Sequence, residues 1–230
     1  KVPTSWVLSM YGAKQLPPQA APELHLIVQA LSERAGLASP PRIHYVPSPM
    51  ANAFVVGHGD DAALAVTDGL LRNLTGRQVA GVLAHEIAHL RAGDTAIMSL
   101  SDAVSRLVQG LSYLGLFTLF LTVPLAARGD PRLLVASLVL AGLPSIVTLL
   151  QLGLSRSREY DADLQAVALT GDVEGLASAL EVLERLEGRV WERLMVPHGR
   201  VPDPLLLRTH LKTSERTRRL DSDAAAVQLV

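Results

Sequence analysis

The spacing of hydrophobic and polar positions predicts a small mixed fold in the first third of the chain. Residues 1–21 follow no clear period and contain several prolines, so we expect an irregular lead-in. Residues 22–36 repeat apolar side chains at helical spacing and end at Gly36, which predicts an amphipathic helix. The run PRIHYVP predicts a short strand between prolines, and residues 52–66 predict a β-hairpin around a Gly- and Asp-rich turn.

A well-marked helix follows this sheet. Residues 67–74 predict a short helix, and Thr75 with Gln78 then forms a T-x-x-Q capping box. The box precedes the run GVLAHEIAHLRAGD, so the two histidines of that run are expected to lie on a helix with a defined start.

The middle of the chain is much more apolar. Residues 107–127 and 133–154 contain no charged residue, and only the polar turn RGDPR lies between them. Each run is about as long as the roughly 20 residues that a membrane-spanning helix needs. A pair of buried helices in a soluble core is the alternative, but two adjacent uncharged runs favour a transmembrane hairpin.

A two-pass hairpin returns the chain to the side of the membrane that it left. We therefore expect residues 1–106 and 155–230 to share one aqueous compartment and to form the two parts of one domain, with residues 107–154 as an inserted hairpin. The class expected is mainly α with a small β-hairpin or sheet (α+β).

Composition narrows the chemistry. The chain has no cysteine, so thiolate metal sites, disulfides and cysteine nucleophiles are excluded and His, Asp and Glu are left to bind any metal. The net charge of −1 argues against nucleic-acid binding, which usually requires a clustered basic surface.

The H-E-I-A-H run is the main candidate for chemistry. Residues four apart lie on one face of a helix, so His85 and His89 are placed to bind one ion. Glu86, about 100° further round, is placed to reach a water on that ion without binding the ion itself. A pair of histidines satisfied within the core or at the surface is the alternative.

A catalytic zinc usually has three protein ligands and one open position. Directly after the second apolar run, Glu159 and Asp163 stand at i, i+4 and are expected on one helix face. One carboxylate would bind the metal and the other would orient a ligand histidine. The alternative is that both are surface charges paired with Arg156 and Arg158.

Together these features resemble the HtpX-like membrane zinc metallopeptidases, which are relatives of the type I CAAX prenyl proteases. The resemblance covers essentially the whole chain and rests on four ordered motifs: NAFVVG (52–57), HEIAHLRAGD (85–94), SRSREYDAD (155–163) and THLKTSERTRRL (209–220). It implies a zincin-like core with one Zn²⁺ per chain. The ligands would be His85, His89 and Glu159.

The resemblance also implies roles for the remaining motif residues. Glu86 would be the general base and Asp163 would support a ligand histidine. The strand containing Asn52, Ala53 and Phe54 would bind substrate backbone by β-addition.

His210 and Arg216 would stabilise the oxyanion of the reaction. The family usually has Thr-His-Pro where this chain has Leu211 after His210, and an exposed basic helix over SERTRRL is the alternative. Family members also carry membrane helices before the equivalent of Lys1, so further residues are expected there.

The predicted function is a membrane-embedded zinc metalloendopeptidase that hydrolyses membrane or misfolded proteins. The resemblance implies an integral protein of a bacterial or archaeal cell membrane, with its site on the cytoplasmic side and a role in protein quality control. A CAAX-type peptidase and a non-catalytic metal-binding scaffold are the alternatives. The expected partners are protein substrates and the lipid bilayer; natural substrates, regulatory partners and oligomeric state stay open.

Overall fold

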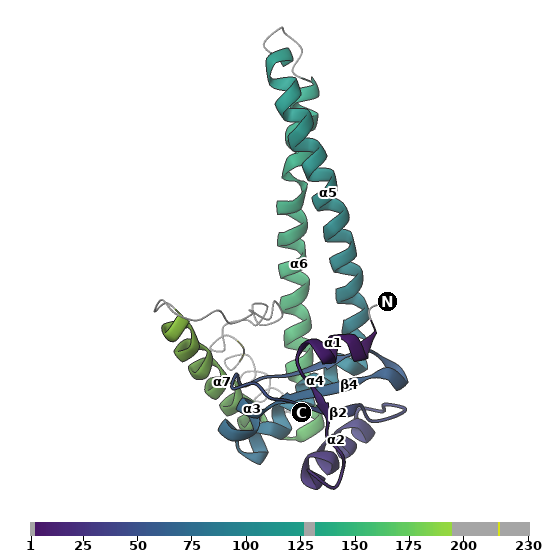
Figure 1. Cartoon of the computed structure of the whole chain (residues 1–230), viewed down its shortest axis with the longest axis vertical. Helices are drawn as coiled ribbons and strands as arrows, with labels where there is room; N and C mark the ends of the chain where they lie inside the picture. Colours follow the sequence, from purple (N-terminus) through teal and green to yellow (C-terminus); the bar gives the residue numbers. More distant parts are fainter. Residues whose placement is uncertain (1–2, 127–131, 195–215, 217–230) are drawn as a thin grey trace, which may run out of the picture. The chain divides into compact units, whose positions relative to one another are not determined.

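The computed structural model describes residues 3–126, 132–194 and 216. The chain divides into two compact units, the first comprising Lys1–Thr95 with Arg158–Val230 and the second Ala96–Ser157. The first unit contains a four-stranded sheet and the helices around it, and the second contains two long helices (Figure 1).

The sheet of the first unit has the strand order β1-β2-β4-β3. Its strands are β1 (Lys14–Gln15), β2 (Arg42–Val46), β3 (Ala53–Val56) and β4 (Ala63–Thr67). The predicted hairpin is confirmed by the antiparallel pairing of β3 with β4. Strand β2 runs parallel to β4, and β1 closes the other edge antiparallel to β2.

Side chains alternate along β4, so that successive residues point to opposite faces of the sheet. Each face is covered by helices. Leu64 and Val66 join the main core with helices α2 (Pro22–Arg34), α4 (Gly76–Ala92) and α7 (Val173–Leu194). Ala63 and Ala65 face the opposite side, where α1 (Thr4–Met10) packs Leu8 against them.

The N-terminal stretch corrects one prediction. Residues 1–21 were expected to be irregular, but the structure contains α1 and the short strand β1 there. Both elements depend on tertiary contacts, because Leu8 is buried against the sheet and β1 has only two residues paired with β2. Local sequence propensity therefore carried little signal for either element.

Local signals define the helix that carries the histidines. Thr67 caps the short helix α3 (Asp68–Asn73) by accepting a hydrogen bond from the Leu70 N–H. The predicted capping box at the start of α4 is confirmed by reciprocal bonds between Thr75 and Gln78. Helix α4 ends at Gly93, whose φ of 70° is the left-handed conformation that glycine adopts without strain.

The second unit is a pair of helices in the two apolar runs, drawn from α5 (Asp94–Ala126) and α6 (Arg132–Thr170), which lie side by side (Figure 1). Ser112 donates to the Ala141 carbonyl at 3.0 Å and Ser137 donates to Thr118 at 3.1 Å. Within the described residues, the length and apolar character that a membrane crossing requires are not found together in any helix. The proposed membrane crossing of this pair stays a prediction.

Candidate metal centre

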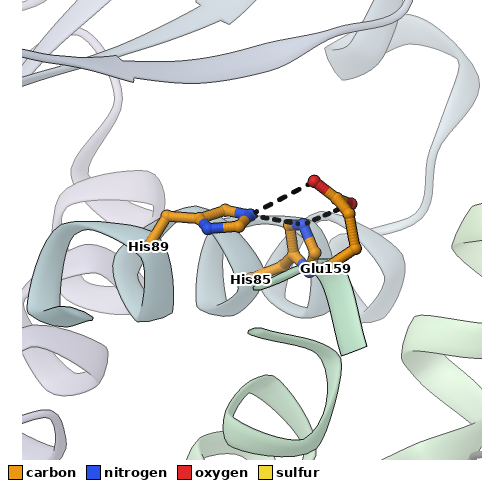
Figure 2. Close-up of side chains that lie close together, drawn as sticks. All are labelled: His85, His89 and Glu159. Carbon is orange, nitrogen blue, oxygen red and sulfur yellow. Dashed lines mark hydrogen bonds and ion pairs between the residues drawn. The ribbon is translucent and has the colours of Figure 1, made fainter. Parts of the chain in front are cut away.

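Helix α4 brings His85 and His89 onto one face, one turn apart. His85 is buried and His89 is partly buried, and their rings meet edge to face with centroids 4.6 Å apart. The two Nε2 atoms lie 3.1 Å from each other, so both imidazoles present the same nitrogen to one point (Figure 2).

Helix α6 supplies the third candidate ligand, Glu159. Its side chain is buried, with Oε2 lying 3.6 Å from Nε2 of His85 and Oε1 lying 3.7 Å from Nε2 of His89. Figure 2 shows the carboxylate facing both rings. All three donor atoms fall within 4.8 Å of one another, which makes the cluster a candidate metal site.

Behind the first histidine lies a second layer of charge. Asp163, one helical turn after Glu159, places Oδ1 at 2.9 Å from Nδ1 of His85. Arg216 donates to both oxygens of Asp163, from Nε to Oδ2 at 2.7 Å and from Nη2 to Oδ1 at 2.5 Å. Asp163 and Arg216 are 1% and 3% exposed, so this pair is held out of water.

The buried charges shift one another's ionisation. Burial works to lower the pKa of His85, but hydrogen bonds to Asp163 and Glu159 outweigh it and raise that pKa to about 9. Burial works to raise the pKa of Asp163, yet the hydrogen bonds from Arg216 and His85 bring it below its usual value. Burial likewise works against the charge of Arg216, and Asp163 raises its pKa nevertheless. Asp163 is therefore an ionised acceptor for His85.

The remaining predicted residues lie in different places. Glu86 follows His85 on α4 and is partly buried. Ala53 and Phe54 begin β3, the edge strand that packs against α4, and Asn52 directly precedes it. The Phe54 side chain, however, packs on the α1 side of the sheet, with its ring 5.1 Å from that of Tyr11.

The C-terminal motif is described only at one residue. His210 lies outside the described residues, whereas Arg216 is helical and buried. The alternative in which SERTRRL forms an exposed face is therefore wrong for Arg216. Likewise, Glu159 and Asp163 are buried at the cluster, so their interpretation as surface charges is wrong.

Sequence reasoning did not identify the support that α7 gives to α4. A Cβ atom at Gly81 would lie 3.1 Å from the backbone of Leu176, so the two helices are in close contact one turn before His85. A strongly amphipathic pattern marks α7 in the sequence, and it would have been the signal for this contact.

Known proteins of one family are similar to this chain. The family model for Peptidase family M48 matches residues 18–224 of the chain. The chain belongs to this family. A protease HtpX homolog of Acaryochloris marina is 39% identical, over 93% of this chain and 76% of its own length. Another from Aquifex aeolicus is 35% identical over the same shares, and one from Pyrococcus abyssi is 34% identical over 98% of this chain and 82% of its own length.

The fold of this M48 chain also has a solved counterpart. The crystal structure of Ste24p from S. mikatae matches 95% of this chain and 53% of its own chain, with a TM-score of 0.52 and 20% identity. The predicted class, mainly α with a small β-hairpin or sheet, is confirmed, whereas the inserted transmembrane hairpin stays a prediction. The family and its HtpX homologues support the predicted membrane zinc metalloprotease, to which CAAX-type peptidases are relatives only. The chain is a metalloprotease.

Proposed function

We propose that the chain is a membrane-embedded zinc endopeptidase in which His85, His89 and Glu159 hold one Zn²⁺ and Glu86 is the general base. The observation that carries the proposal is the convergence of two imidazole nitrogens and one carboxylate on a single point. The membership of this chain in peptidase family M48 supports the hydrolytic chemistry.

The spacing of the donor atoms fits zinc. Ligands about 2.0–2.2 Å from a tetrahedral zinc lie about 3.4 Å from each other. Here the two Nε2 atoms are 3.1 Å apart, and each lies close to a different oxygen of Glu159, His85 at 3.6 Å from Oε2 and His89 at 3.7 Å from Oε1. Two nitrogens and one carboxylate also leave a fourth position open, which is typical of a catalytic rather than a structural zinc.

Zinc bound there would supply Lewis acidity, which lowers the pKa of water and polarises a peptide carbonyl. Glu86 would accept the proton of the attacking water and then donate it to the leaving amine. Glu86 directly follows His85 on α4 and is partly buried. Asp163 would hold His85 in the tautomer whose Nε2 lone pair is free for the metal.

Strand β3 supports a mode of substrate binding. It is the edge strand of the sheet and packs against α4, the helix that carries both histidines. We propose that an extended substrate segment adds to this edge along Asn52, Ala53 and Phe54. The N–H and carbonyl of Asn52 already bond to Thr67, so the other outward-facing backbone groups of this stretch would make the contact. Because the Phe54 ring is already packed against Tyr11, the backbone rather than this side chain would make the contact.

Membrane insertion is supported by the surface of the helix pair. In the second unit, large apolar side chains are exposed while hydroxyls bond between the two helices, an arrangement common in membrane proteins. The exposed side chains are Val104, Leu107, Leu111, Tyr113, Leu114, Leu116, Phe117, Phe120, Leu121, Val135, Leu138, Val139, Ile146, Leu150 and Leu154. We place the site on the cytoplasmic side of a bacterial or archaeal cell membrane, acting on membrane or misfolded proteins.

The test is metal removal and return. The chain, purified in detergent, is assayed for zinc content and for casein cleavage, then treated with a strong chelator and reloaded with zinc. One zinc per chain, loss of cleavage with the metal, and recovery on reloading are expected. Cleavage that persists without metal would contradict the proposed mechanism.

A further inference from the structure

Arg216 contacts three members of the cluster at once. Its guanidinium binds both oxygens of Asp163, its Nη1 lies 3.6 Å from Oε2 of Glu159, and its Nη2 lies 3.4 Å from Nδ1 of His85. It comes from a segment 53 residues beyond Asp163 and 131 residues beyond His85. The cluster is therefore built from α4, α6 and Arg216, which is far from both helices in the sequence.

The hydrogen bonds of Arg216 lie on the side of His85 that faces away from the metal position, and only Nη1 approaches Glu159, at 3.6 Å. The metal-facing atom of His85 is Nε2, whereas Asp163 and Arg216 meet the ring at Nδ1. An oxyanion donor has to reach about 2.7–3.1 Å from the reacting oxygen. Two of the three guanidinium nitrogens of Arg216 are already bonded to Asp163.

We infer that Arg216 is a positioning residue that fixes the carboxylate of Asp163, and through it the ring of His85, and that it does not bind the reacting oxygen. The inference rests on the proposed function only in that His85 holds a metal. Because Arg216 bonds to both oxygens of Asp163, the carboxylate presents Oδ1 to the Nδ1–H of His85 in one geometry. Lysine cannot replace this bidentate interaction, because its ammonium is a single point charge.

The chain contains a control with the same bonding atoms in an exposed position, where Arg77 also bonds Glu174. Arg77 binds both oxygens of Asp172 through the same pair of nitrogens, with Nε to Oδ2 at 2.5 Å and Nη2 to Oδ1 at 2.6 Å. That pair joins the start of α4 to the residues between α6 and α7 in the same unit, away from the cluster. Arg77→Lys therefore removes the same type of contact without touching a metal ligand or Asp163.

The experiment compares Arg216→Lys, Asp163→Asn and Arg77→Lys in the full chain in detergent. Zinc affinity is measured by competition with a chromophoric chelator, and Co²⁺ is used as a spectroscopic probe of ligand geometry. We expect Arg216→Lys and Asp163→Asn each to weaken zinc binding by roughly 10–100-fold and to change the Co²⁺ absorption spectrum. Arg77→Lys should change neither, and thermal melting of the metal-free chains reports folding for all three.

The double variant Asp163→Asn/Arg216→Lys separates a shared role from two independent ones. If Arg216 acts through Asp163, the double variant should bind zinc about as weakly as the weaker single variant, because the second change removes nothing further. Losses that multiply would overturn the inference.

Three other results would also overturn it. Arg216→Lys could retain wild-type zinc affinity and Co²⁺ spectrum while turnover falls, which is the result for an oxyanion donor. Arg77→Lys could weaken zinc as much as Arg216→Lys, which would indicate a general loss of stability. Metal-free Arg216→Lys could also fail to fold while Arg77→Lys folds, which would make Arg216 purely structural. A wild-type chain that binds no metal would instead contradict the proposed function.

Discussion

Oδ1 of Asp163 lies 2.9 Å from Nδ1 of His85, on the far side of the ring from the nitrogen that faces His89 and Glu159. The two carboxylates of α6 thus approach His85 at its two different nitrogens. One is placed to share a metal with the ring and the other to orient it, although both come from adjacent turns of one helix.

The first prediction concerns proton transfer. Glu86→Gln removes the proton acceptor and leaves His85, His89 and Glu159 in place, so zinc content should stay at one per chain. Casein cleavage should fall by about 10²–10⁴-fold, which is the usual contribution of a general base. Both quantities are measured on the same preparation, and full activity in this variant would rule out Glu86 as the base.

The second prediction separates the roles of the two carboxylates of α6. Glu159→Ala should abolish stoichiometric zinc binding, because two imidazoles alone do not complete the site. Asp163→Ala should retain zinc but weaken affinity or activity by roughly 10–100-fold, since it loses only the contact that orients His85.

Metal analysis after dialysis against a weak chelator distinguishes the two variants. In a zinc-loaded crystal structure, a Glu159 oxygen should lie about 2.0–2.2 Å from the ion. A structure in which Asp163 or His210 binds zinc and Glu159 points to solvent would contradict this assignment.

The third prediction concerns the membrane. Because the chain has no cysteine, single cysteines at Arg128 and Asp94 can be labelled without background. If residues 107–127 and 133–154 cross the bilayer, a membrane-impermeant maleimide should reach the two positions from opposite sides of a sealed vesicle. The purified chain should also require detergent. Labelling of both cysteines from one side would favour a helix pair that does not span the bilayer.

The fourth prediction concerns the support behind the metal centre. In Gly81→Leu, the new Cβ would lie 3.1 Å from the backbone of Leu176, so the rest of the side chain has no room. This variant should lower the free energy of unfolding by about 1–3 kcal/mol. Gly76→Leu, on the same helix, meets none of the described residues within 4 Å of its Cβ and should be close to neutral. Thermal melts of the metal-free chains measure the difference, and equal losses would mean that the α4–α7 contact is not limiting.

Several helices and strands could be predicted from the sequence because the residues that specify each of them lie within the element itself. The capping box of Thr75 and Gln78, the alternation along β3 and β4, and the uncharged runs each predict an element from its own residues. The four-residue spacing of His85 and His89 likewise fixes their common helix face. Neither α1 nor β1 had such a signal, because Leu8 and the two residues of β1 depend on partners distant in the chain.

What only the tertiary structure decided is how distant segments meet at the metal centre. Spacing alone left open which of Glu159 and Asp163 would face the metal, since residues four apart share a helix face; the packing of α6 against α4 sends one to Nε2 and the other to Nδ1 of His85. The place of Arg216 was equally hidden. An arginine in a basic stretch usually lies in solvent. Arg216 becomes part of the cluster because the fold buries it against Asp163.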